Sequence, residues 1–296
     1  MENISIDLYQ NYILEKLIKK RLYIWACDYS KNTGEGLLAR LFTRELNKKN
    51  IIKINKKIYI NHKYIAPFIG ILFCWKNYLM NRGVVYVNYL PLWNTLIFLF
   101  LPPNTILGPI TGGAKYSKKN KKNFIIRNYL FPILYKISEK LINLRFKNII
   151  FSTSLLKKFL SKKTINNSYF NFVFKFISLK KKNKKNIHLI IYYRRHSNKL
   201  TFFPIKFLKK ILKKKYSVHV IGDILNIKNV INHGKLSNKK VQKLQSRSKY
   251  TIASGENFYS LFILECISNH VKILVNEKDY KKIDFYKDKF INKKLI

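Results

Sequence analysis

The chain has 296 residues, of which 47% are hydrophobic, and its 59 Lys and Arg against 14 Asp and Glu give a formal net charge of +45 at pH 7. The apolar fraction excludes a wholly disordered chain, and the length suits two compact domains. The charge indicates a polyanionic partner, such as nucleic acid, an anionic membrane surface or nucleotide phosphates.

The first half of the chain alternates predicted strands and helices. The apolar run 21–28 is typical of a strand covered on both faces, and it leads through a glycine turn into a helix that carries apolar residues from 37 to 46. Beyond this helix the pattern predicts strands at 51–54, 83–90, 105–107 and 148–152, and helices at 66–79, from Pro91 to before Pro102, and at 129–144. Such alternation predicts a parallel sheet with helices on its faces.

The apolar stretch 84–101 is about long enough to cross a membrane. Asn88, Pro91 and Asn94 interrupt it, however, and these residues are unfavourable in a membrane span. We therefore expect a buried strand followed by a helix at this place.

A second alternation begins after the basic run 179–186, which has no apolar period and is the best candidate for a linker. The pattern predicts strands at 187–193, 217–221, 229–232, 250–253 and 272–275, and helices at 203–214, at 238–245 and, carrying Glu265, before the last of these strands. Two such halves that face each other would place the carboxyl ends of both sheets around one cleft, where ligands of open α/β sheets bind.

The cysteines and histidines indicate neither a disulfide framework nor a metal centre. Cys27, Cys74 and Cys266 lie far apart, which favours reduced, buried thiols in a cytosolic protein. The 6 His are scattered and suggest no metal site. The first twenty residues contain acids and a helical apolar period, unlike a signal peptide. We expect a cytoplasmic protein.

The segment 255–265 (GENFYSLFILE) places two of the scarce acids, Glu256 and Glu265, one short loop and two helical turns apart. This spacing suits a loop that enters a helix N-terminus, where free N–H groups and the helix dipole favour a phosphate-bearing ligand. The acids could also be a helix cap and a surface residue. Similarly, Arg194 and Lys199 follow a predicted strand and could hold an anion or form a solvated basic turn.

Two glycine loops stand in the first half, at 34–36 (GEG) and 108–113 (GPITGG). A backbone without Cβ atoms can approach an anion closely, although glycines also serve tight turns with positive φ. With the acids and the basic turn, these loops make up the candidate site residues.

The order of these segments resembles the retaining glycosyltransferases of the GT-B fold, the group 1 type that uses nucleotide-diphosphate sugars. The element order matches over 21–275, and specific residues match between 193 and 275 and at the glycine loops. The resemblance implies an α/β fold of two Rossmann-like parallel-sheet domains that face each other across a cleft. They would be an acceptor-side domain at 1–178, a basic linker at 179–186, and a short nucleotide-sugar-binding domain at 187–296.

The resemblance also implies roles for single residues. Arg194 and Lys199 would stabilise the departing diphosphate, and Glu265 would hold the ribose. Glu256 would contact the donor sugar, but the interval to Glu265 is one residue longer than usual. Counting back from Glu265 therefore puts Asn257 in that place, and both assignments stay open. The facing wall would be lined by the glycine loops, with Gly34, Gly36, Gly112 and Gly113.

The expected function is transfer of a sugar to a glycan or lipid-linked acceptor, as in cell-envelope polysaccharide synthesis, with the nucleotide-sugar as donor substrate and no metal or other cofactor. The protein would be cytoplasmic or bound peripherally to the inner face of the cell membrane, where Tyr89, Trp93 and Phe98 suit docking on anionic lipid. Two alternatives are a basic nucleic-acid-binding protein and an inactive GT-B relative that only binds. Nucleic acid is disfavoured because the aromatic residues fall in apolar segments.

Overall fold

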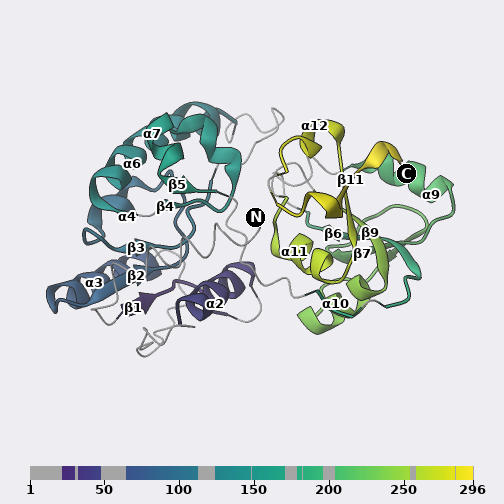
Figure 1. Ribbon diagram of the computed structural model, residues 1–296, viewed down its shortest axis with the longest axis horizontal. Coiled ribbons are helices and arrows are strands. Elements are labelled where there is room, and N and C mark those ends of the chain that lie inside the picture. The colour runs from purple at the N-terminus through teal and green to yellow at the C-terminus, as the bar shows by residue number, and fades with distance from the viewer. Residues whose placement is uncertain are drawn as a thin grey trace. The chain divides into compact units, whose positions relative to one another are not determined.

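The computed structural model describes residues 22–30, 33–47, 65–112, 124–147, 149–170, 179–181, 183–195, 204–253, 258–283 and 285–295. They belong to two compact units, the first within 22–170 and the second within 179–295 (Figure 1). All strand pairs in both units are parallel, and helices alternate with the strands. The predicted α/β class with parallel sheets is therefore confirmed.

The first unit contains a three-stranded parallel sheet in the order β1-β2-β3, with a separate β4-β5 pair linked to it by a bridge between Ile110 and Phe151. The strands are β1 (Leu22–Trp25), β2 (Gly83–Tyr86), β3 (Ile106–Leu107), β4 (Ile149–Ile150) and β5 (Ser168–Tyr169). The helices are α2 (Gly34–Asn47), α3 (Ala66–Leu79), α4 (Thr95–Phe100), the π-helix η1 (Ile126–Leu130), α6 (Phe131–Arg145), the 3-10 helix η2 (Ser154–Phe159) and α7 (Lys162–Asn166).

The core of the first unit lies between this sheet and α3, α4 and α6. Trp25, Tyr86, Phe98 and Phe151 are almost wholly buried in it, because the apolar strand runs are covered by helices. Polar contacts connect α6 to the start of α7. The buried Glu139 carboxylate on α6 accepts hydrogen bonds from the Ser161 N–H (2.7 Å), the Ser161 hydroxyl (2.6 Å) and the Thr164 hydroxyl (2.5 Å).

The second unit is a six-stranded parallel sheet in the order β11-β10-β9-β6-β7-β8. Its strands are β6 (Ile187–Tyr193), β7 (Val218–Gly222), β8 (Val230–Asn232), β9 (Ser248–Ile252), β10 (Lys272–Val275) and β11 (Phe290–Asn292). Its helices are α9 (Ile205–Lys213), α10 (Asn238–Ser246), α11 (Leu261–Ser268), α12 (Glu277–Tyr280) and the 3-10 helices η3 (Lys287–Lys289) and η4 (Lys293–Leu295).

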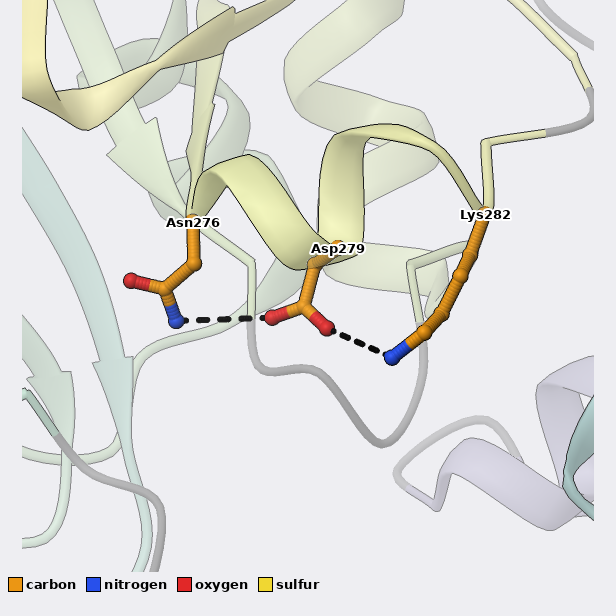
Figure 2. A network of polar contacts seen from close by, with 3 residues as sticks. All are labelled: Asn276, Asp279 and Lys282. Carbon is orange, nitrogen blue, oxygen red and sulfur yellow. Dashed lines mark hydrogen bonds and ion pairs between the residues drawn. The ribbon is translucent and has the colours of Figure 1, made fainter.

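The sixth strand, β11, is an addition that the sequence patterns do not predict. It pairs in parallel with β10 through Ile273 and Phe290, so it extends the sheet at one edge. The chain reaches it through α12, where Asp279 accepts hydrogen bonds from Asn276 (3.4 Å) and from Lys282 (3.1 Å), as Figure 2 shows. These contacts are solvent-exposed, so they organise the turn while adding little stability.

Two predicted elements differ from the structure. The helix expected from Pro91 begins only at Thr95, because Pro91 instead forms a bridge with Thr111. The strand expected at 83–90 ends at Tyr86, and Tyr89 has a positive φ of 58°, which is incompatible with an extended strand. The strand expected at 51–54 lies outside the described residues. Among the described residues, no helix is both long and apolar enough to cross a membrane.

The basic run 179–186 lies against the second unit where it is described. The Lys180 N–H donates to the Ser268 carbonyl oxygen (3.0 Å), and the Lys185 ammonium donates to the Asn269 carbonyl oxygen (2.7 Å). Its role as a linker, the domain boundaries and the roles of the two domains stay predictions.

Candidate functional site

The order of the strands in the second unit creates a switch point between β6 and β9. From β6 the chain proceeds outward through β7 and β8, and it then crosses to the other side and proceeds outward through β9, β10 and β11. β6 and β9 are therefore neighbours whose connections leave in opposite directions. Such a place opens a crevice at the carboxyl ends of the strands, which is where open α/β sheets bind ligands. Along the chain, Arg194 directly follows β6, and α11 with Glu265 is the next helix after β9.

The basic turn after β6 is fixed by Asp223 at the end of β7. The Arg195 N–H donates to the Asp223 carboxylate (2.7 Å), and the Asp223 N–H donates to the Tyr193 carbonyl oxygen (3.0 Å). Gly222 has a φ of 105°, and a Cβ there would lie 2.2 Å from the Tyr193 carbonyl oxygen. Only glycine fits this close approach. The turn presents Arg194 with its side chain exposed to solvent.

The other flank of the switch point is the N-terminus of α11, which follows β9. Ser260 caps this helix, accepting a hydrogen bond from the Ile263 N–H (3.4 Å). The preceding Tyr259 is buried, and its hydroxyl exchanges two hydrogen bonds with the Phe285 backbone. The ring of Phe262 lies 5.7 Å from that of Tyr192 at the end of β6. The first turn of α11 therefore lies beside the end of β6, which Arg194 directly follows.

Glu265, on the second turn of α11, is partly buried and bonded to α10. Its carboxylate accepts a hydrogen bond from the Asn238 amide (2.6 Å), and Asn238 in turn accepts one from Gln242 (2.6 Å). Burial raises the pKa of Glu265, while the bond from Asn238 and the charge of Lys180 oppose the rise. The carboxylate is thus held in place by its neighbours, as a residue that positions a ligand hydroxyl must be.

In the first unit, the loop between β1 and α2 is organised by Asp28. Its carboxylate accepts hydrogen bonds from the Ser30 N–H (2.8 Å) and from the Thr33 hydroxyl (2.5 Å). Thr33 caps α2, because its hydroxyl accepts from the Gly36 N–H (3.0 Å). The Asn88 amide, after β2, donates to the Asp28 carbonyl oxygen (2.7 Å), which fastens the loop to the neighbouring strand end.

The two glycines of this loop differ in their surroundings. A Cβ on Gly34 would meet no atom within 4 Å, whereas one on Gly36 would lie 2.3 Å from the Ser30 carbonyl oxygen. Gly36 is therefore required by the packing of the loop on the helix. Between them, Glu35 has a raised pKa, chiefly because of burial and also because of the nearby Asp28. The described part of this loop therefore carries two neighbouring acids, Asp28 and Glu35.

The second glycine loop follows β3 and is tied to the segment after β2. The Thr111 N–H donates to the Leu90 carbonyl oxygen (2.9 Å), and the Leu92 N–H donates to that of Thr111 (2.9 Å). Gly112 has a φ of 142°, a conformation that other residues rarely adopt. The positive φ at Gly112 fits the alternative that the sequence leaves open for this loop, a tight turn.

Within the described residues, no group of three or more His, Cys, Asp and Glu could hold a metal ion. Two histidines do meet: His219 Nδ1 and His233 Nε2 lie 2.9 Å apart on neighbouring strand segments. Burial lowers the pKa of His219, and the adjacent His233 lowers it further. Proximity of this kind depends on strand pairing, so their sequence positions alone did not indicate it.

The structure places Arg194 and Glu265 in the second unit and Gly34, Gly36 and Gly112 in the first. The other predicted site residues lie outside the described residues, namely Lys199, Glu256, Asn257 and Gly113. The roles of all of them stay predictions. Asp223 and Asn88, which organise these loops, were not predicted from the sequence. Their signal is a polar residue directly after an apolar strand run, which is weak by itself.

No family model matches this chain, and no curated protein matches it. Among solved structures, it is similar to an alpha-glucosyltransferase in complex with UDP-glucose and DNA containing an abasic site, with 12% identity, 90% of this chain and 82% of that chain covered, and a TM-score of 0.48. It is also similar to a glycosyltransferase from Rickettsia africae, with 12% identity, coverages of 86% and 78%, and a TM-score of 0.43. A protein assigned as a UDP-N-acetylglucosamine 2-epimerase from Listeria monocytogenes gives 10% identity, coverages of 86% and 78%, and a TM-score of 0.42.

Proposed function

We propose that this protein is a GT-B-type glycosyltransferase that moves a sugar from a nucleotide-diphosphate donor to a hydroxyl of a glycan or lipid-linked acceptor. The observation that carries the proposal is the switch point of the second unit, which an exposed arginine and a capped helix N-terminus flank. Both groups favour an anion, and the crevice at such a point is the usual ligand position of a parallel sheet.

In this proposal the donor diphosphate lies between Arg194 and the N-terminus of α11, with Lys199 as a second cation. As the bond between the sugar and the diphosphate breaks, negative charge grows on the departing oxygen. A guanidinium and oriented N–H groups stabilise that charge, which lowers the barrier. This chemistry needs no metal ion, since the cations of the chain neutralise the leaving group.

The remaining predicted residues position the sugars. Glu265 can accept hydrogen bonds from the ribose hydroxyls while it keeps its bond to Asn238, because a carboxylate has acceptor sites on both oxygens. Glu256 or Asn257 would contact the transferred sugar, whose configuration would be retained. The acceptor would lie against the loops of the first unit, those of Gly34–Gly36 and Gly112–Gly113. The reaction would take place in the cytoplasm or at the inner face of the cell membrane.

A thermal-shift panel of UDP-, GDP- and ADP-sugars tests the donor site. We expect at least one nucleotide-sugar to raise the melting temperature of the wild type, and Arg194→Ala to weaken its binding roughly 10–100-fold, since a hydrogen bond to a charged group contributes about 1.5–3 kcal/mol. Arg195→Ala is the matched control, because it removes an adjacent exposed guanidinium and keeps the N–H that binds Asp223. Equal losses in both variants, or no stabilising nucleotide-sugar, would contradict the proposal.

A second candidate function is nucleic-acid binding, which the net charge of +45 favours. Retention on an immobilised oligonucleotide at moderate salt, together with no response to any nucleotide-sugar, would support it over the enzyme. A protein that binds a nucleotide-sugar but releases no free nucleotide with any acceptor would instead be an inactive relative. Turnover by Glu256→Gln and Asn257→Ala separates the two assignments for the sugar contact.

A further inference from the structure

The helices α3, α4 and α6 of the first unit form one layer with an outer face that is unusually apolar. α3 packs on β1 and β2, and α4 packs on both α3 and α6 (Figure 1). Polar contacts lock the layer together: the Trp75 indole N–H donates to the Phe100 carbonyl oxygen (2.7 Å), and the Arg145 guanidinium donates to that of Leu101 (2.6 Å). α4 therefore connects α3 to α6.

Each helix of the layer has exposed apolar side chains at helical spacing. On α3 they fall at positions 68, 72 and 79, and the side chain of Leu72 is 68% exposed. On α6 and the preceding turn they fall at 130, 133 and 137, and that of Ile133 is 58% exposed. α4 adds Leu96, Leu99 and Phe100 between them. We call this set the apolar face.

α6 carries apolar side chains on two opposite sides, one that faces the core and one that faces solvent. Tyr135, Ser138 and Ile142 point into the core, whereas Ile133 and Ile137 are exposed. A surface helix of a globular protein normally carries polar residues opposite its buried stripe. Contiguous exposed apolar surface that polar residues surround marks a site of interaction with a protein or a membrane.

On the described helices that carry the apolar face, the exposed charged side chains are basic. α3, α4 and η1 contain no acid, and Glu139, the one acid of α6, is buried in its contacts with Ser161 and Thr164. Lys76, Lys136 and Lys140 are exposed on the same helices. Lysines at the rim of an apolar surface match the anionic headgroups of a lipid leaflet, because the aliphatic residues enter the acyl boundary while the ammonium groups stay at the surface.

We propose that the apolar face is a docking surface for an anionic lipid bilayer. A second copy of this chain would bring another charge of +45 against the same lysines, which disfavours self-association. Nucleic acid would need aromatic rings for stacking, and most of the apolar face is aliphatic. Of the aromatic residues that the sequence suggested for membrane docking, Phe98 is wholly buried and therefore does not take part, whereas Trp93 is 38% exposed.

Flotation with lipid vesicles tests the proposal without reference to glycosyl transfer. The probes are vesicles of phosphatidylcholine alone and of equal parts phosphatidylcholine and phosphatidylserine, at moderate salt. We expect the wild type to float with the anionic vesicles. The triple variant Leu72→Gln, Ile133→Gln, Ile137→Gln should lose roughly a hundredfold in partition coefficient, since each exposed side chain that enters the bilayer contributes about fivefold. These positions are exposed, so the variant should fold, which circular dichroism would verify.

Matched variants in the second unit supply the controls. Ile224 is 72% exposed there, and Ile224→Gln should leave flotation unchanged. Lys136→Gln with Lys140→Gln should reduce the partition coefficient roughly 25-fold, at about fivefold per lysine near an anionic surface. Lys239→Gln with Lys240→Gln removes the same charge from exposed positions of α10 and should have a much smaller effect.

Three outcomes would overturn the proposal. One is flotation of the triple variant as strong as that of the wild type. Another is an equal loss with both lysine pairs, because binding would then follow net charge and not this surface. The third is a concentration-dependent dimer in sedimentation velocity that the triple variant abolishes, because the apolar face would then be a contact between two copies. Nucleotide-sugar binding by the triple variant should remain intact, so failure here and failure of the proposed enzyme are distinguishable.

Discussion

Replacing Gly36 by alanine should destabilise the first unit and loosen the loop that follows β1. A Cβ at this position would lie 2.3 Å from the Ser30 carbonyl oxygen, 2.4 Å from the Ser30 backbone nitrogen and 2.8 Å from the Asp28 carboxylate. Real Cβ contacts are not that short, so either the loop or the start of α2 must move. Movement of the loop would strain the hydrogen bond by which Asp28 holds the Ser30 N–H.

The expected change in the free energy of unfolding is the sum of two unfavourable contributions and one favourable one. Forcing extra volume into a packed position costs about 1–3 kcal/mol, and weakening the Asp28 hydrogen bond costs about 1 kcal/mol. Alanine regains about 1 kcal/mol because its helix propensity exceeds that of glycine. The net loss is about 1–3 kcal/mol, which lowers the melting temperature by roughly 2–4 °C for each kcal/mol in a domain of this size.

The assay is urea unfolding followed by circular dichroism, with Gly34→Ala as the control in the same helix turn. A Cβ on Gly34 meets nothing within 4 Å, so this variant should be neutral or up to about 1 kcal/mol more stable. The comparison removes the general effect of a glycine-to-alanine change near a helix start. Equal stability of the two variants would refute the reasoning, because it would show that the close approach of the loop to Gly36 has no energetic consequence.

Three further predictions concern the carboxylates Glu139, Glu265 and Glu277. Glu139→Ala should cost about 1–3 kcal/mol of unfolding free energy, because it removes the acceptor of the Ser161 N–H and of the buried Thr164 hydroxyl, and Glu139→Gln should cost clearly less because its amide oxygen still accepts; equal urea midpoints for the two would contradict this. The pKa of Glu265 is raised in the folded state, so folding favours its protonated form. The stability that this preference contributes is present below the ordinary pKa of 4.5 and is lost as pH rises through the folded-state pKa. Glu265→Gln should therefore gain stability relative to the wild type between acid and neutral pH. Glu277→Gln should show the opposite trend, because Lys294 lowers the pKa of Glu277.

The strands that the sequence predicted best are those whose apolar residues are buried on both faces. Runs such as 187–193 have only one favourable environment, the inside of a parallel sheet, and the structure places β6 there. β11 was not predictable in this way, because Phe290–Asn292 is short and lysines surround it. It is a strand because β10 offers a free edge to pair with, which is a tertiary effect.

The candidate site shows the same division between local and tertiary information. The position of Arg194 after a strand could be predicted from the sequence, because a strand end and a basic turn are local features. The bond between Asp223 and the Arg195 N–H could not, because it requires β6 and β7 to be neighbours. The start of α4 at Thr95 instead of Pro91 has a similar cause, since the bridge to Thr111 depends on a segment twenty residues away.

Acids are scarce in this chain, and their placement argues that both strand-end edges matter. Asp28 follows β1 in the first unit and Asp223 follows β7 in the second, and each carboxylate accepts a backbone N–H of a loop at the carboxyl edge of its sheet. A neutral side chain would leave those loops less firmly held, because charge-assisted hydrogen bonds are the stronger ones. The chain offers 59 Lys and Arg as partners for its few acids, yet these two carboxylates bind backbone N–H groups at the sheet edges. This use is best explained if the loops must keep one conformation. That is the requirement of preorganised ligand sites, and it applies to each unit separately.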